Sequence, residues 1–202
     1  TAGKPADARE RSLLGPFRDE VKPEILDVTC QFPESDGSDQ NRTNQRRDEK
    51  LAIARVVVSR VPLGTVVGLT GGTTTTEAAR MLAVRDQLTV VTNALNIAAE
   101  LSIRPKVKVV VPGGVARPQS YELVGVWGAQ VLRGLNIGVA VVGVDGVDAV
   151  GGLTTHDEVE AQTNAALIER ARKVYVVADS SKLGRVHLAC IAGIETVTEV
   201  VT

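Results

Sequence analysis

Glycine and threonine residues that could hold an anion follow a strand-like segment at residues 65–69. The run reads GGTTTT at 71–76, and a helix-like segment continues from Glu77. The glycines allow a tight turn and the close approach of a ligand. Thr74 and Glu77 have the spacing of a capping box, which predicts that the helix begins there. The free N–H groups and positive dipole end of such a helix suit a phosphate or a carboxylate; the alternative is an ordinary strand-to-helix turn.

Four further strand-like segments also end in small or hydrogen-bonding residues. These ends are Thr92-Asn93 after 88–91, Gly113-Gly114 after 107–111, Asp145-Gly146 after 138–144, and the DSSK segment ending at Lys182 after 174–178. Ligands bind at the carboxyl ends of strands in open α/β sheets, so the five ends together predict one site. Each end also has a structural interpretation, because such residues cap helices, form turns or are solvated.

The elements that must position these residues alternate between the two types of secondary structure. Helices are predicted at 51–61, 77–83, 94–101, 124–132 and 158–171, and strands at 66–69, 88–91, 107–111, 138–144 and 174–178. The strands are short, apolar and rich in β-branched residues, and most connections are long enough for a helix. This pattern predicts an α/β fold with a mostly parallel sheet and helices on both faces.

Composition excludes several classes of function. The 202-residue chain is 44% hydrophobic but only 2% aromatic, which favours a core of Val, Leu, Ile and Ala, and its net charge of −1 argues against bulk affinity for nucleic acid. Two isolated cysteines and the absence of a long apolar run predict a cytoplasmic protein without a membrane partner. His156 and His187 suggest no third ligand, so no metal is expected. Walker, dinucleotide and nucleophile-elbow motifs are missing, and no cofactor is expected.

A series of short motifs resembles the C-terminal effector domain of DeoR-type bacterial transcription regulators. In chain order they are EKLAIA (49–54), GTTT (72–75), VVTNAL (90–95), VPGG (111–114), ELVG (122–125), GVDGV (143–147), GGLT (151–154) and ADSSKLG (178–184). The resemblance spans roughly residues 45–202. It implies the fold shared by ribose-5-phosphate isomerases and coenzyme A transferases, and binding of a phosphorylated sugar or related metabolite.

The resemblance also implies a set of site residues. Gly72, Thr73, Thr74 and Thr75 would hold the phosphate. The pocket would be lined by Thr92, Asn93, Gly113 and Gly114. Asp145 and Lys182 would meet the sugar or its phosphate, and Glu158 would lie near the pocket. No residue is expected to be catalytic.

The predicted organisation is a linker or arm at 1–44 and an effector-binding domain at 45–202. The family's winged helix-turn-helix is not evident in the arm; Arg46-Arg47-Asp48 only superficially matches its Arg-Arg-Asp-Leu segment. The expectation is therefore a fragment of a longer regulator, whose DNA contact belongs to an N-terminal module outside this chain. We expect a repressor in carbohydrate metabolism, assembled as a homodimer or homotetramer.

Two other functions remain open at the level of the sequence. A sugar-phosphate isomerase on the same fold would need a carboxylate base, which Asp145, Asp148 or Glu158 could supply. The segment VDGVDA at 144–149 lacks the Glu of the isomerase-type motif, which favours the sensor. A purely structural oligomerisation module is the third possibility.

Overall fold

The computed structural model describes residues 26–27 and 39–202. Its main sheet has seven strands in the order β1-β12-β10-β7-β2-β3-β4, and every pair in it is parallel. The strands are β1 (Leu26–Asp27), β2 (Val66–Leu69), β3 (Leu88–Thr92), β4 (Val107–Val110), β7 (Ile137–Gly143), β10 (Ala171–Val177) and β12 (Glu199–Val201). The predicted parallel α/β sheet is confirmed.

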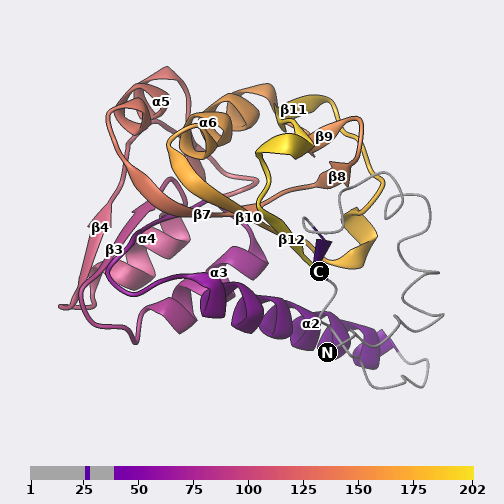
Figure 1. Ribbon diagram of the computed structural model, residues 1–202, viewed down its shortest axis with the longest axis horizontal. Coiled ribbons are helices and arrows are strands. Elements are labelled where there is room, and N and C mark those ends of the chain that lie inside the picture. Colours follow the sequence, from indigo (N-terminus) through magenta and orange to yellow (C-terminus); the bar gives the residue numbers. More distant parts are fainter. Residues whose placement is uncertain (1–25, 28–38) are drawn as a thin grey trace, which may run out of the picture.

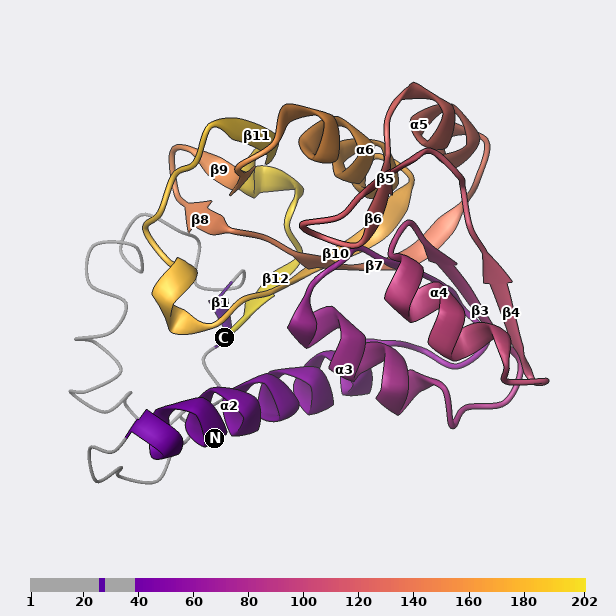
Figure 2. The same cartoon turned by 180° about the vertical axis from the view of Figure 1, so that it is seen from behind.

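Helices cover both faces of this sheet (Figures 1 and 2). One face carries α2 (Asp39–Arg60), α3 (Thr73–Leu82) and α4 (Leu95–Ser102), and the other carries α5 (Val126–Arg133) and α6 (Glu158–Ile168). The alternation of side chains along β7 explains the two layers. Val139 and Val141 pack toward the α2–α4 side, whereas Ala140 and Val142 pack toward α5 and α6.

Smaller elements follow the carboxyl ends of the strands. The hairpin β5 (Val115–Arg117) and β6 (Glu122–Val124) follows β4. A second antiparallel sheet contains β8 (Gly146–Asp148), β9 (Gly152–Thr155) and β11 (Ala189–Ala192). Two short 3-10 helices, η2 (Ser180–Lys182) and η3 (Ile194–Thr196), complete the described chain. None of these elements was predicted from the apolar pattern, because each has only three or four residues, too few to show a clear period.

Several predicted helix boundaries were wrong. The helix expected at 51–61 begins at Asp39, so α2 runs across the predicted limit between arm and domain at 44/45. The helix expected at 124–132 begins only at Val126, because residues 122–124 form β6. The helix expected at 158–171 ends at Ile168, since Ala171 already pairs with Ile137 in the sheet. The remainder of the predicted arm, residues 1–25 and 28–38, lies outside the described residues.

Within the described residues, no helix is long and apolar enough to cross a membrane. In the same part of the chain, no group of three His, Cys, Asp or Glu residues could hold a metal ion. His156 and His187 do lie together, with ring centroids 3.9 Å apart.

Candidate functional site

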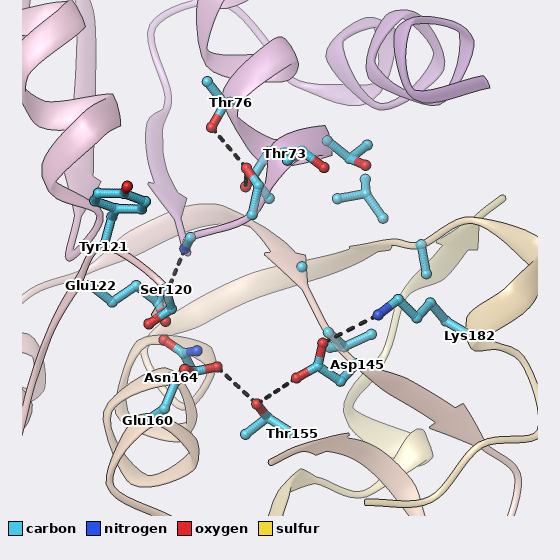
Figure 3. Close-up of a pocket in the computed structure, with 18 of the residues that line it drawn as sticks. Thr73, Thr76, Ser120, Tyr121, Glu122, Asp145, Thr155, Glu160, Asn164 and Lys182 are labelled. Atoms are coloured by element: carbon cyan, nitrogen blue, oxygen red, sulfur yellow. Dashed lines mark hydrogen bonds and ion pairs between the residues drawn. The ribbon is translucent and has the colours of Figure 1, made fainter. Parts of the chain in front are cut away.

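A cleft of about 860 Å³ lies at the carboxyl ends of β2, β7 and β10. Its position follows from the strand order. After β2 the chain adds β3 and β4 on one side, and it then returns to place β7 and β10 on the other side. The connections after β2 and β7 therefore diverge, and this divergence leaves a crevice between them. The hairpin β5–β6 and helix α6 supply further walls, as Figure 3 shows.

The first turn of α3 forms one wall of the cleft. Gly72 is the N-cap of α3 with φ of 127°, a backbone conformation that favours glycine, and no side chain caps this end. The hydroxyls of Thr75 and Thr76 donate to the Gly72 carbonyl oxygen, each at 2.8 Å. The predicted capping box was thus wrong, because the helix begins at Thr73 and its threonines bond backward. The N–H groups of the first turn carry the positive end of the helix dipole to the cleft.

Glu122 supports the loop that leads into α3. Its Oε1 atom accepts a hydrogen bond of 2.7 Å from the Gly71 amide. A Cβ atom at Gly71 would lie 2.7 Å from the Glu122 carboxyl carbon, so the Glu122 side chain would have to shift if Gly71 carried a side chain. Glu122 is only 2% exposed. Burial, and then the nearby Glu160 carboxylate, raise the pKa of Glu122 to about 7, against the opposing effect of the Gly71 hydrogen bond.

The opposite wall contains two carboxylates that share one hydroxyl. Thr155 Oγ1 lies 3.0 Å from Asp145 Oδ2 and 2.8 Å from Glu160 Oε1 (Figure 3). A hydroxyl has a single proton to donate, so it cannot satisfy both carboxylates at once. One of them keeps acceptor capacity for a hydroxyl of a ligand.

Cations fix these two carboxylates from either side. Lys182 Nζ lies 3.2 Å from Asp145 Oδ1, and Arg117 lies 3.2 Å from Glu160 and 3.1 Å from Asp157. Burial favours a raised pKa for Asp145, but the hydrogen bonds from Thr155 and Lys182 outweigh it and hold the pKa below its usual value. Asp145 is therefore ionised at neutral pH and acts as a hydrogen-bond acceptor.

Six of the predicted site residues line the cleft: Gly72, Thr73, Thr74, Thr75, Asp145 and Lys182. Lys182 is paired with Asp145, so its charge is already partly compensated. The Thr75 hydroxyl is likewise occupied, because it donates to the Gly72 carbonyl oxygen.

The other five predicted residues do not line the cleft. Thr92 and Asn93 are fully buried at the end of β3. Thr92 Oγ1 accepts a hydrogen bond from the Ala94 amide. Asn93 Nδ2 donates to Asn164, which lines the cleft, so Asn93 supports the cleft without lining it.

Gly113 and Gly114 instead turn the chain into the hairpin. A Cβ atom at Gly114 would lie 2.6 Å from the Val124 carbonyl oxygen. Glu158 is exposed on α6 and does not line the cleft. Asp157 is the N-cap of α6, and Thr155 bonds to the carboxylates of Asp145 and Glu160.

Sequence reasoning missed several residues of the cleft, chiefly Lys50, Arg117, Glu122, Glu160 and Asn164. Glu122 belongs to one of the motifs that carry the family resemblance, and Lys50 to another. The roles of Arg117, Glu122 and Asn164 were not visible because their partners lie far away in sequence. Glu122, for example, meets Gly71 across 51 residues.

Known proteins resemble this chain in both sequence and fold. A family model described as the DeoR C-terminal sensor domain matches residues 45–202. The glycerol-3-phosphate regulon repressor of Escherichia coli K12 is 30% identical over 162 residues, which are 80% of this chain and 64% of the relative. The chain thus spans less than two thirds of that relative's length. The relative is named a repressor, in agreement with the prediction of a regulator and not an enzyme.

Two solved structures share the fold. The probable sor operon regulator from Shigella flexneri aligns with a TM-score of 0.56 at 13% identity, covering 95% of each chain. A D-ribose-5-phosphate isomerase in complex with phospho-erythronic acid aligns with a TM-score of 0.50 at 20% identity, covering 68% of this chain and 54% of the isomerase. The expected family and the expected isomerase-like fold are both confirmed.

Proposed function

Because this chain belongs to the family of DeoR C-terminal sensor domains, we propose that its cleft binds a phosphorylated sugar or a related metabolite. The observation that carries this proposal is the uncapped first turn of α3 in the wall of the cleft. By contrast, the N-terminus of α6 is satisfied by Asp157, which accepts from the amides of Val159 and Glu160. Unpaired N–H groups together with the helix dipole favour a phosphate group at Thr73 and Thr74.

The rest of the ligand would lie toward Asp145 and Glu160. These carboxylates provide acceptors for sugar hydroxyls, because the single Thr155 proton can satisfy only one of them at a time. A phosphate at one end and several hydroxyls at the other match the two halves of the cleft. The name of the glycerol-3-phosphate regulon repressor, which links that relative to a small phosphate ester, supports the same class of ligand.

We further propose that ligand binding controls a DNA-binding module in a longer protein. The matched part of the chain covers 64% of a relative named as a repressor, and the family resemblance implies that an N-terminal module not evident here contacts DNA. A ligand that prefers one arrangement of a homodimer or homotetramer would shift operator affinity, by a coupling free energy of about 1–3 kcal/mol. We expect the longer protein to act as a repressor.

Two substitutions at Thr73 test the proposed phosphate site. Thr73 is exposed in the first turn of α3. Thr73→Glu adds a negative charge that suits the helix dipole, so the fold should persist while a phosphate is repelled. Thr73→Gln is the matched neutral control.

The assay is thermal unfolding with glycerol 3-phosphate, ribose 5-phosphate and their unphosphorylated counterparts. A ligand at about 100 times its Kd should raise the Tm of the wild type by about 5–10 °C. The phosphorylated compound alone should do so; Thr73→Gln should retain most of the shift and Thr73→Glu should lose it. Equal shifts by sugars without phosphate, or an undiminished shift in Thr73→Glu, would contradict the proposal.

A further inference from the structure

Helix α2 contributes one side chain, Lys50, to the lining of the cleft. It is the sole α2 residue there within the described part of the chain. Lys50 is half-buried. The helix that carries it runs along α3 and extends past the edge of the sheet (Figure 1).

The cleft contains three Lys or Arg side chains in different states of charge compensation. Arg117 is paired with Asp157 and Glu160, and Lys182 is paired with Asp145. Lys50 forms no ion pair within 4.0 Å with any residue that the structure describes. An anion entering the cleft would therefore find Lys50 as the cation whose charge is not already compensated.

Lys50 also lies at the point where α2 leaves the core. Of the α2 side chains from residue 47 onward, those up to Ala52 are exposed or half-buried, and Ile53 is the first buried one. From there Ile53, Ala54 and Val57 hold the helix against α3. A contact made by Lys50 would add a tether one turn earlier, on the side that leads to the N-terminal part of the chain.

We propose that Lys50 binds the anionic group of the ligand and thereby fixes the first half of α2 against the N-terminus of α3. This inference rests on the proposed function, since it takes the ligand of the cleft to be phosphorylated. In this proposal, α2 couples ligand binding in the cleft to the segment that precedes the helix in the chain. The helix is suited to this because one rigid element bears both the ligand contact and the connection to the preceding segment.

Three variants of the full 202-residue chain test this inference. Lys50→Gln removes the charge, and Lys50→Arg retains it. Lys173→Gln is the control, because Lys173 is exposed near the start of β10, at the end of the sheet opposite the cleft. All three should melt like the wild type without ligand, since none removes a described ion pair.

The measurements are calorimetric titration with glycerol 3-phosphate and with inorganic phosphate, and hydrogen exchange of the amides at 39–50. We expect Lys50→Gln to bind on the order of tenfold more weakly, as for loss of one charge-assisted contact. Saturating ligand should slow exchange at 39–50 at least several-fold in the wild type, Lys50→Arg and Lys173→Gln, but not in Lys50→Gln.

The outcomes separate the two proposals. If the wild type binds the phosphate compounds while Lys50→Gln binds them equally well and gains the same protection at 39–50, the role of Lys50 is refuted and the phosphate site stands. If the wild type binds neither compound and no other phosphate ester, the proposed function fails and this inference fails with it. Weaker binding by Lys50→Gln with unchanged protection at 39–50 would refute the tether.

Discussion

Glu122 should make the stability of the fold depend on pH in a way that a single substitution removes. The residue is 2% exposed, and its carboxylate accepts from the Gly71 amide at 2.7 Å. In Glu122→Gln the side chain keeps its shape and its carbonyl acceptor but cannot ionise. The two proteins should therefore differ in how the free energy of unfolding changes with pH.

The size of the effect follows from the raised pKa of Glu122. Burial and the Glu160 carboxylate raise it from 4.5 to about 7. Between these values the folded protein binds more protons than the unfolded chain, so the stability from this group is present below pH 4.5 and is lost as the pH rises toward 7. At about 1.4 kcal/mol per pKa unit, the whole loss is about 3 kcal/mol, of which about 2–3 kcal/mol falls between pH 5 and pH 8.

Urea unfolding of both proteins at pH 5 and pH 8 measures this difference. Taking the variant relative to the wild type cancels the titration of all other groups that the substitution leaves unchanged. Glu122→Gln should gain about 2–3 kcal/mol over the wild type on going from pH 5 to pH 8. Glu169→Gln, at an exposed site just after α6, should unfold in parallel with the wild type. If the difference in unfolding free energy between Glu122→Gln and the wild type is the same at both pH values, the raised pKa of Glu122 is refuted.

Two other predictions concern the same site. Gly71→Ala should lower the free energy of unfolding by about 1–3 kcal/mol, because the added Cβ meets the Glu122 carboxyl carbon at 2.7 Å, whereas Gly64→Ala, which meets nothing within 4 Å, should cost about 1 kcal/mol through its φ of 71° alone. Urea unfolding checks both, and equal costs would show that the contact is unimportant. A coupled assay with ribose 5-phosphate should detect no isomerisation, since Asp145 is held by Lys182 and Thr155; turnover by the wild type that Asp145→Asn abolishes would make the protein an enzyme.

The central sheet could be predicted because its signal is local. Each of β2, β3, β7 and β10 contains a short run of apolar, mostly buried residues, so the type of element was clear from neighbouring residues. The first residues of the helices were not clear, because more than one nearby residue could serve as the N-cap. Thr155 occupies the first position of a possible capping box, yet Asp157 caps α6 while Thr155 turns toward Asp145.

Site residues could be predicted where they directly follow a central strand. They could not be predicted where segments distant in sequence come together. The segment from Gly71 to Thr76, which includes the first turn of α3, and the turn at Asp145 follow adjacent central strands, and both line the cleft. Thr92 and Asn93 end the next strand outward, where α4 and the hairpin cover them. Glu122, by contrast, reaches Gly71 only because residues 115–124 fold back as a hairpin, and no spacing in the sequence encodes that contact.

The most direct test of a phosphate site at α3 is a crystal structure of the chain with the phosphate ester that gives the largest thermal shift. The phosphorus atom should lie against the first turn of α3, with phosphate oxygens within about 3 Å of the backbone nitrogens of Thr73 and Thr74. The sugar hydroxyls should then face Asp145 and Glu160. Phosphate density beside Arg117 with the first turn of α3 unoccupied, or a ligand bound outside the cleft, would contradict this assignment.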